Sequence, residues 1–312
     1  MTQRRPPEGG LPFDPERLAT PSGAAAVLER YGLAPRKGLG QNFLVDRNIV
    51  RQIAAAAELT DGDVAVEIGP GLGALTWALA ERARAVVAIE VDAGLVRWLE
   101  ELARLRANIR IVHADALTVD FRRLLEEHPL GPGGAYKLVA NLPYYITTPL
   151  LMRLLEEHLP LSAMVIMVQR EVAQRITARP GTKDYGALSV AVQLRADVEP
   201  VAVVSPNVFL PRPQVESAVL RLRLRPLPAE VADEALLFAV VRAAFGQRRK
   251  TLRNALKSAA VPAGGGQPPW PAEAVARALA EAGIDGERRG ETLSADEFIR
   301  LANALASCRG AH

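Results

Sequence analysis

Cysteine and aromatic side chains are scarce in this chain of 312 residues, and long apolar runs are absent. Cys308 is the one cysteine, which excludes a disulfide scaffold and a cysteine-rich metal site, so we predict no metal centre. The longest apolar run, at 161–168, falls well short of the ~18 residues that a membrane span needs. The N-terminal segment lacks the apolar core of a secretory signal. The sequence therefore favours a reduced, cytoplasmic protein that does not span a membrane.

The composition is that of a globular protein, with 49% hydrophobic and 23% charged residues, and it excludes disorder as the overall state. The length suggests one large domain or two. The net charge of +3 is too small to identify a nucleic-acid-binding protein, but it is unevenly distributed, because residues 203–257 carry +6 and the rest of the chain −3. A basic segment on a mildly acidic body favours a polyanion-binding surface. A solvated helix face is the alternative interpretation of the same charges.

Short apolar runs with strand character alternate with helical stretches over much of the chain. We expect strands at 64–68, 85–89, 109–112, 137–140, 164–168 and 199–204. We expect helices at 74–82, 93–104, 148–157, 170–178 and 185–194. This alternation predicts βαβ units and a mostly parallel sheet.

The N-terminal and C-terminal parts of the chain lack this alternation of strands and helices. Residues 1–20 are rich in Pro and Arg, and we expect them to be disordered. A helix is expected at 22–31, and Asp46 is the expected N-cap of another. The strictly alternating run at 218–225 has one apolar face and one arginine face, which predicts an antiparallel or edge strand. The remaining expected elements are helices at 233–245, 248–259, 271–282 and 294–305, the last opening with a Ser294–Glu297 capping box.

We therefore expect an α/β domain at 21–228 and a smaller, all-helical domain at 229–312. The strongest local signal in the first is EIGPGLGALT at 67–76, which follows an expected strand and opens a helix. Glycines at 69, 71 and 73 let the backbone turn tightly and let a ligand approach. Glu90 ends the next strand and can accept hydrogen bonds from both hydroxyls of a ribose. A nicotinamide dinucleotide and S-adenosylmethionine both suit this loop, and a glycine turn without a ligand has the same pattern.

Two later strand ends favour one of these cofactors. Asp115 follows the third strand, where a carboxylate can accept a hydrogen bond from an adenine amine. The fourth strand ends in Asn141-Leu142-Pro143-Tyr144. The Asn141 amide oxygen and the Leu142 carbonyl can each accept one N–H of a planar amine, Pro143 stiffens the turn, and Tyr144 can stack on a base. These residues favour methyl transfer over hydride transfer.

From about residue 31 to 305 the chain resembles the ribosomal RNA adenine dimethyltransferase family (KsgA-type). The matching blocks are QNFL (41–44), EIGPGLGALT (67–76), IEVD (89–92), DAL (115–117), NLPYYITTP (141–149), VQREVAQR (168–175), FLPRPQVESAV (209–219), FGQRRKTLRNAL (245–256) and RGETLS (289–294). Tyr145 stands where the family often has Asn. The resemblance implies a Rossmann-like, S-adenosylmethionine-dependent methyltransferase sheet followed by a smaller helical domain.

The same resemblance implies roles for individual residues. The residues implied to contact S-adenosylmethionine are Asn42, Leu44, Gly69, Gly71, Glu90, Asp115 and Asn141. Those implied to hold and activate the target adenine are Asn141, Leu142, Pro143, Tyr144 and Phe209, with Tyr144 and Phe209 stacking on its two faces. The cations expected to bind RNA are Arg221, Arg223, Arg248, Arg249, Lys250, Arg253 and Lys257. At helical spacing, Arg249, Arg253 and Lys257 would share one face.

By resemblance, the expected function is N6-dimethylation of two adjacent adenosines in a hairpin loop near the 3′ end of small-subunit rRNA. The expected partner is this rRNA within an immature 30S subunit, with a part in ribosome biogenesis, and we expect a monomer. One alternative is a large-subunit rRNA methyltransferase of the macrolide-resistance type, against which FGQRRKTLRNAL and RGETLS argue. Another is an assembly factor whose binding role is primary.

Overall fold

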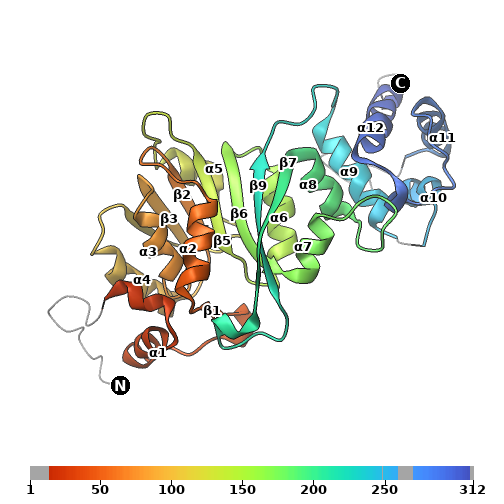
Figure 1. The fold of residues 1–312 in the computed structure, drawn as a ribbon. Helices are drawn as coiled ribbons and strands as arrows, with labels where there is room; N and C mark the ends of the chain where they lie inside the picture. The colour runs from red at the N-terminus through yellow and green to blue at the C-terminus, as the bar shows by residue number, and fades with distance from the viewer. Residues whose placement is uncertain (1–13, 248, 259–269, 310–312) are drawn as a thin grey trace. The chain divides into compact units, whose positions relative to one another are not determined.

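A seven-stranded sheet dominates the computed structural model, which describes residues 14–247, 249–258 and 270–309. Its strands lie in the order β4-β3-β2-β5-β6-β9-β7 (Figure 1). Their bounds are β2 Val64–Ile68, β3 Ala85–Glu90, β4 Ile109–His113, β5 Tyr136–Asn141, β6 Leu161–Gln169, β7 Ala196–Val204 and β9 Ser217–Leu224. All seven strands predicted from the sequence are present, with ends that shift by up to three residues.

Parallel pairing sets the geometry of the first five strands. β2 pairs in parallel with β3 on one side and β5 on the other, so that Ile68 lies opposite both Ile89 and Ala140. β3 also pairs in parallel with β4, and β5 with β6. Every residue of β2 is buried, as expected for a parallel strand covered on both faces. Because the carboxyl ends of parallel strands meet at one edge, the residues that follow β2, β3, β4 and β5 gather there.

β9 runs antiparallel to both of its neighbours in the sheet. The Arg170 amide at the end of β6 donates to the Glu216 carbonyl just before β9, and the Arg225 amide just after β9 donates to the Arg195 carbonyl just before β7. The predicted antiparallel direction is therefore confirmed. The predicted arginine face is wrong for Arg221, which is only 7% exposed in a strand flanked on both sides.

Five helices accompany the parallel strands: α1 Pro21–Arg30, α2 Arg47–Ala56, α3 Ala74–Ala80, α4 Ala93–Ala103 and α5 Phe121–Glu126. The predicted N-cap is confirmed, because a carboxylate oxygen of Asp46 accepts the first free amides of α2 at 2.8 and 3.0 Å. α4 buries Trp98, Leu99 and Leu102 completely. α5 was not predicted, because its six residues are too few to show a helical period.

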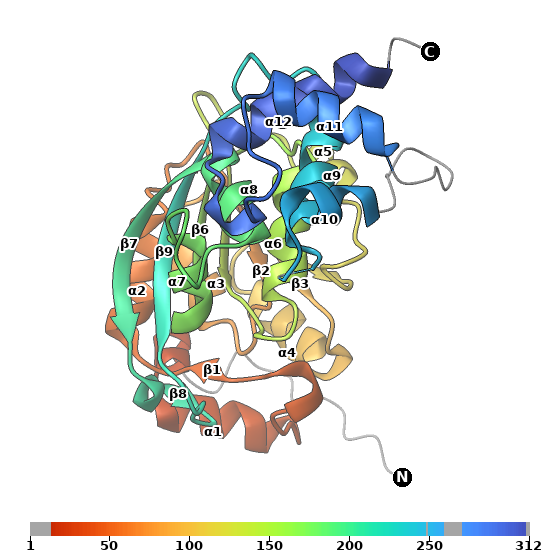
Figure 2. The same cartoon turned by 90° about the vertical axis from the view of Figure 1, so that its right-hand side faces the viewer.

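A second, two-stranded sheet joins distant parts of the chain, and Figure 2 shows its strands side by side. β1 (Phe43–Leu44) pairs antiparallel with β8 (Phe209–Leu210), with Leu44 opposite Phe209. Before α1, a short 3-10 helix at Pro15–Ala19 places Leu18, fully buried, in a cluster with Trp98. The expected disorder is therefore wrong for residues 14–20, and residues 1–13 lie outside the described part.

The chain divides into two compact units. The first contains the residues up to Thr147 together with Leu159–Arg170 and Glu199–Arg221. The second contains Thr148–His158, Glu171–Val198 and the chain from Leu222 onward. Its helices, of which α6 and α7 each begin one residue before the unit does, are α6 Thr147–Glu156, α7 Arg170–Ile176, α8 Ala187–Arg195, α9 Glu234–Phe245, α10 Leu252–Ser258, α11 Ala272–Glu281 and α12 Ala295–Arg309. The expected domains, 21–228 and 229–312, stay a prediction about which parts fold independently.

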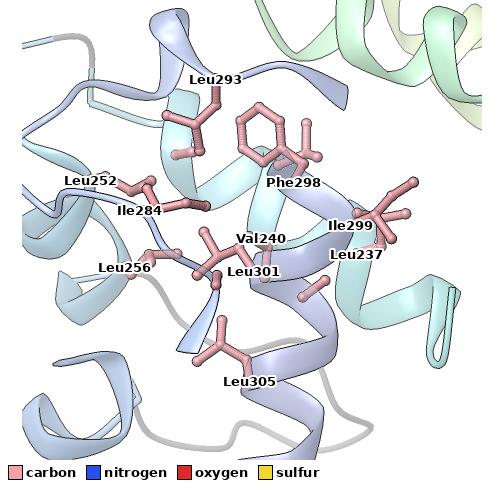
Figure 3. Packing of buried hydrophobic residues seen from close by; sticks show 14 of the residues in the cluster. Leu237, Val240, Leu252, Leu256, Ile284, Leu293, Phe298, Ile299, Leu301 and Leu305 are labelled. Carbon is pink, nitrogen blue, oxygen red and sulfur yellow. The ribbon is translucent and has the colours of Figure 1, made fainter. Parts of the chain in front are cut away.

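The second unit has its own hydrophobic core, in which α9 and α12 supply much of the apolar surface (Figure 3). Leu237 and Val240 of α9 pack with Phe298 and Leu301 of α12, and all four are at most 2% exposed (Figure 3). The capping box predicted at the start of α12 is present, with reciprocal bonds between residues 294 and 297 at 2.9 and 3.2 Å. The α/β class with a helical C-terminal region is thus confirmed.

Candidate functional site

A cavity in the first unit opens at the carboxyl edge of the parallel strands. The ends of β2, β3 and β5, the residues just after β4, and the segment 39–44 line it. Along the chain the strands proceed from β2 to β4 on one side and then return to β5 on the other side of β2. In open α/β sheets, ligands bind at the point where the strand order reverses. The cavity lies at that point.

The glycine loop that follows β2 forms the floor of this cavity. Gly69, Gly71 and Gly73 all have positive φ, at 68°, 58° and 85°. At Gly71 the positive φ favours glycine, and a Cβ atom would also stand only 3.0 Å from the Phe43 ring, which would have to shift slightly. The α3 helix begins directly after Gly73. The sequence-predicted loop is therefore formed, and at Gly69 and Gly71 the backbone lines the cavity without a side chain.

Glu90, at the end of β3, is a buried carboxyl group held by backbone donors. It is 5% exposed, and its Oε1 accepts the amides of Val91 and Asp92, each at 2.9 Å. Burial raises the pKa of Glu90 above its ordinary value, and the backbone amides oppose that shift. A fixed carboxyl group at this depth can accept hydrogen bonds from the paired hydroxyls of a ribose.

Asp115 lies one strand further along the same edge and also lines the cavity. Its Oδ1 accepts the Leu117 amide at 2.8 Å, which orients the carboxylate. The neighbouring His113 ends β4, and its Nε2 lies 3.3 Å from the Val91 carbonyl. This contact gives His113 a structural role at the end of the strand.

The turn after β5 brings four of the predicted residues into the cavity, Asn141, Leu142, Pro143 and Tyr144. The Asn141 Nδ2 donates to the Asn42 carbonyl at 3.4 Å, which leaves Oδ1 as the acceptor of that amide. The Leu142 amide donates to the Met167 carbonyl at 3.0 Å. Hydrogen bonds from Asn141 and Leu142 to two different segments therefore fix the position of the turn.

The Tyr144 ring is fixed at its far end, because its hydroxyl lies 3.1 Å from Oγ of the buried Ser217 at the start of β9. Phe209, its expected partner, is not among the residues that line the cavity. Phe209 is 5% exposed and packs in the core that contains Leu44. The structure therefore brings Tyr144 to the cavity but not the Phe209 ring, because the β1–β8 pairing places that ring in the core.

The segment 39–44 closes one side of the cavity. Asn42 and Leu44, both predicted to contact the cofactor, line it. The Asn42 Nδ2 donates to the Gly40 carbonyl at 3.0 Å, and Leu44 is 8% exposed in β1. Tyr145 also lines the cavity but is 54% exposed, so its ring stands at the mouth.

Sequence reasoning did not assign a role to Glu67, the last polar residue of β2. It lines the cavity, it is 1% exposed, and its Oε2 has no hydrogen-bond partner among the described residues. Burial raises the pKa of Glu67 to about 8, with the nearby Glu90 charge adding to the shift. The sequence does contain a signal that Glu67 has a role. A carboxyl group buried within the otherwise apolar VAVEI run costs free energy, and such a cost indicates that the group serves a function.

The cations expected to bind RNA fall into four groups. Arg221 is buried and forms an ion pair with Glu58 through both of its terminal nitrogens, so it is not available to a phosphate. Arg223, on the same strand, is exposed. Arg248 lies outside the described residues. The rest lie in or just before α10.

The expected arginine face of α10 is wrong. The helix begins at Leu252 and not at 248, so Arg249 and Lys250 precede it in an exposed turn. Arg253 and Lys257 lie in the helix, where Arg253 is exposed at 3.6 Å from Glu287 and Lys257 is half-buried. The three residues predicted at i, i+4 and i+8 therefore do not share one helical face.

Two further features bear on ligands. Among the described residues, no group of three or more His, Cys, Asp or Glu side chains is arranged to hold a metal ion. Over the same residues, no helix has the length and apolar character that crossing a bilayer requires.

The cavity fits S-adenosylmethionine by its donor set. The glycine loop leaves backbone free of side chains, Glu90 suits a ribose, and Asp115 suits an adenine amine. Glu67 adds a buried carboxyl group to the polar lining of the cavity. The residues present therefore match the chemistry of this cofactor.

Comparisons with known proteins agree with this geometry. The family model for ribosomal RNA adenine dimethylase matches residues 32–306. A ribosomal RNA small subunit methyltransferase A of Geobacillus sp. (strain WCH70) is 50% identical over 92% of this chain and 97% of its own. The protein of that name from Pelotomaculum thermopropionicum is 52% identical over 94% of this chain and 99% of its own.

Two solved structures extend the comparison to the fold. A dimethyladenosine transferase from Plasmodium falciparum has a TM-score of 0.70 at 24% identity and covers 85% of this chain and 98% of its own. The 23S rRNA methyltransferase ErmE has a TM-score of 0.57 at 29% identity and covers 85% of this chain and 100% of its own. With the family match over nearly the whole chain, the chain belongs to the ribosomal RNA adenine dimethylase family of methyltransferases.

Proposed function

We propose that this chain transfers methyl groups from S-adenosylmethionine to N6 of two adjacent adenosines in small-subunit rRNA. The proposed partner is an immature 30S subunit in the cytoplasm, and the proposed acting form is a monomer. One observation carries the proposal: the turn from Asn141 to Tyr144 opens into the same cavity as Glu90 and Asp115. A planar amine and an adenosine-containing cofactor therefore share one space.

We propose that the cofactor is held at its adenosine end by Glu90 and Asp115. Asn42, Leu44, Gly69 and Gly71 lie around the rest of the cavity, with Asn141 at its reacting end. When bound, S-adenosylmethionine supplies an electrophilic methyl group on a sulfonium centre. The protein has then to place a nucleophile in line with it and to keep water away.

The exocyclic amine of adenine is a weak nucleophile, because its lone pair is delocalised into the ring. Two acceptors in the ring plane, the Asn141 Oδ1 and the Leu142 carbonyl, would take its two N–H groups and localise that pair on nitrogen. The bonds from Asn141 to Asn42 and from Leu142 to Met167 hold these acceptors in place before the substrate arrives. Alignment of this kind supplies a large part of the rate of an in-line displacement.

Tyr144 supplies the aromatic surface at the reacting end. Its hydroxyl contact with Ser217 leaves the ring as the face on which a flipped adenine stacks. We propose that Phe209 stacks on the opposite face of the adenine, after its ring turns out of the core when RNA binds. The attacking nitrogen becomes acidic as it gains positive charge, so no dedicated base is required. After one transfer it keeps one N–H and can react again.

Exposed cations support the choice of an RNA substrate. Arg223 on β9, Arg249 and Lys250 in the turn before α10, and Arg253 within it are open to solvent. Contacts of such side chains with phosphates fix position and confer little sequence choice. We propose these four, with Lys257 and Arg248, as the cations that bind RNA, and we leave out the buried Arg221.

A second candidate function is methylation of large-subunit rRNA, which the similarity to the 23S rRNA methyltransferase ErmE favours. Curated relatives at 50% identity and above carry small-subunit names, which supports the first candidate. A third is an assembly factor that binds an immature subunit, with methylation incidental. An Asn141→Ala protein that lost all methylation and still fully rescued a deletion strain would make binding the primary role.

The discriminating experiment is methyl transfer from labelled S-adenosylmethionine to unmethylated 30S subunits, 50S subunits and naked rRNA, followed by nucleoside analysis. We expect N6,N6-dimethyladenosine in the small-subunit rRNA and no label in the 50S particle. Label confined to 50S would favour the second candidate. Absence of dimethyladenosine in every substrate would overturn the proposal.

A further inference from the structure

The segment 36–42 is held against the cavity by side chains to which neither the comparisons nor the proposed chemistry gives a role. It connects α1 to β1, and Leu39, Gly40 and Gln41 line the cavity. Gly40 ends the short 3-10 helix Lys37–Leu39 in the left-handed region, at φ 59°. A Cβ at Gly40 would stand 3.5 Å from the Tyr145 ring, so this turn lies beside the cavity mouth.

One buried carboxylate, that of Asp92, holds the segment down. Asp92 is 4% exposed, and its Oδ2 accepts the Gln41 Nε2 at 3.0 Å and forms an ion pair with the Arg36 Nε at 3.2 Å. The Gln41 Oε1 in turn accepts the Arg36 backbone amide at 2.8 Å. These three residues form a closed ring of contacts, which we call the clasp.

The clasp is continuous with the proposed ribose-binding residue. The Asp92 amide donates to the Glu90 Oε1 at 2.9 Å, so one turn of backbone carries both carboxyl groups. The Asp92 Oδ1 accepts the Gly94 amide at 2.8 Å, which anchors this turn to the start of α4. A shift of the turn therefore moves the clasp and Glu90 together.

The two sides of the clasp differ in exposure. The Arg36 side chain is 60% exposed, and the Asp92 side chain is 4% exposed. Water can replace Arg36 easily, whereas loss of Gln41 would leave a buried carboxylate short of a donor. The contact of Gln41 with Asp92 is therefore the stronger of the two.

We propose that Gln41 and Arg36 are positioning residues that keep the segment 36–42 closed over the cofactor, and that opening of the clasp controls how fast the cofactor exchanges. The inference rests on the proposed function, because dimethylation of two adenosines needs four methyl transfers. Each transfer leaves S-adenosylhomocysteine, which must leave before the next S-adenosylmethionine enters. The clasp thus lies at the exchange step and does not touch the reacting atoms.

The test uses the full chain with Gln41→Leu, which keeps much of the side-chain volume but removes both hydrogen-bonding atoms, and with Arg36→Gln. Lys37→Gln is the matched control, because it removes the same charge one residue away from the clasp. Release of S-adenosylhomocysteine is followed by stopped-flow displacement. We expect Gln41→Leu to speed release about 5- to 30-fold, and Arg36→Gln about 2- to 5-fold, in line with a buried and an exposed contact.

A second readout needs no cofactor. The Arg36 amide donates to Gln41, so Gln41→Leu should raise its hydrogen-exchange rate by about tenfold or more in the free protein. The inference would be overturned if, in both variants, the rate of S-adenosylhomocysteine release and the hydrogen-exchange rate of the amide at position 36 stayed within twofold of the Lys37→Gln control. A wild-type chain that binds neither S-adenosylmethionine nor its product would instead contradict the proposed function, and the exchange of the Arg36 amide would still decide whether the clasp forms.

Discussion

At the scale of single residues, Asn141 has the most direct part in the proposed chemistry. Its Nδ2 donates to the Asn42 carbonyl, so its Oδ1 is the acceptor left for the proposed substrate amine. We expect Asn141→Ala to lower the single-turnover rate of methyl transfer about 100- to 1000-fold, the usual cost of losing one preorganised polar contact to a transition state. Rapid-quench measurement at saturating cofactor tests this, and a rate within threefold of wild type would contradict the assigned role.

The raised pKa of Glu67 makes the stability of the ligand-free protein fall as the pH rises. Its pKa is about 8 in the folded protein and near 4.5 when unfolded, so the folded state binds more protons between these values. The contribution of Glu67 to stability is therefore fully present below about pH 4.5 and is lost as the pH rises toward 8. We expect urea midpoints from pH 5 to 8 to fall less steeply in Glu67→Gln than in wild type. Equal slopes in the two proteins would show that Glu67 is ionised at neutral pH.

At the scale of elements, β9 carries an arginine with a structural role, whereas α10 and the turn before it carry candidate RNA ligands. The Arg221 side chain is 9% exposed and pairs with the half-exposed Glu58, so Arg221→Ala should cost about 1–3 kcal/mol of stability and leave the salt dependence of RNA binding unchanged. Chemical denaturation and RNA titrations at several salt concentrations measure the two effects. A shallower salt dependence in Arg221→Ala would return this residue to the RNA-binding set.

The turn before α10 should show the opposite behaviour. Arg249 and Lys250 are exposed, and replacing both by Ala should leave stability nearly unchanged. The slope of log affinity against log salt should become shallower by roughly 1.4, since each lost contact with a single-stranded phosphate is worth about 0.7. An unchanged slope would mean that these cations form only a solvated surface.

The capping box of α12 yields a stability prediction for the second unit. Ser294 accepts the Glu297 amide at 3.2 Å, and Glu297 accepts the Ser294 amide at 2.9 Å. We expect Ser294→Ala to cost about 1 kcal/mol, the usual value for an N-cap. Thermal or urea unfolding measures it, with the exposed neighbour Arg289→Ala as a surface control. No loss relative to that control would contradict the assigned cap.

Elements with a repeating apolar pattern could be predicted from the sequence, and elements without one could not. The parallel strands and α2, with its Asp46 cap, fall in the first class. The second includes β1 and β8, whose two residues each pair only because the fold brings 43–44 beside 209–210. α10 was predicted to begin too early because the charges at 249 and 250 suit a helix surface as well as they suit a turn.

At the scale of the whole molecule, the candidate site follows from sheet topology. Glu90, Asp115 and Asn141 could be placed together from the sequence, because each lies at or just after the carboxyl end of a strand of one parallel sheet. The burial of Phe209, the pKa of Glu67 and the clasp at Asp92 could not be predicted. Each depends on tertiary contacts between segments that are distant in the chain, which no local pattern records.

The central claim is that one cavity brings S-adenosylmethionine and an rRNA adenine amine together. Its most direct test is transfer of labelled methyl from S-adenosylmethionine to unmethylated 30S subunits, with wild type and Asn141→Ala compared and the nucleosides analysed. We predict N6,N6-dimethyladenosine at two adjacent positions with wild type and at most traces with Asn141→Ala. A wild-type protein that binds the cofactor yet leaves 30S rRNA unlabelled would contradict the account.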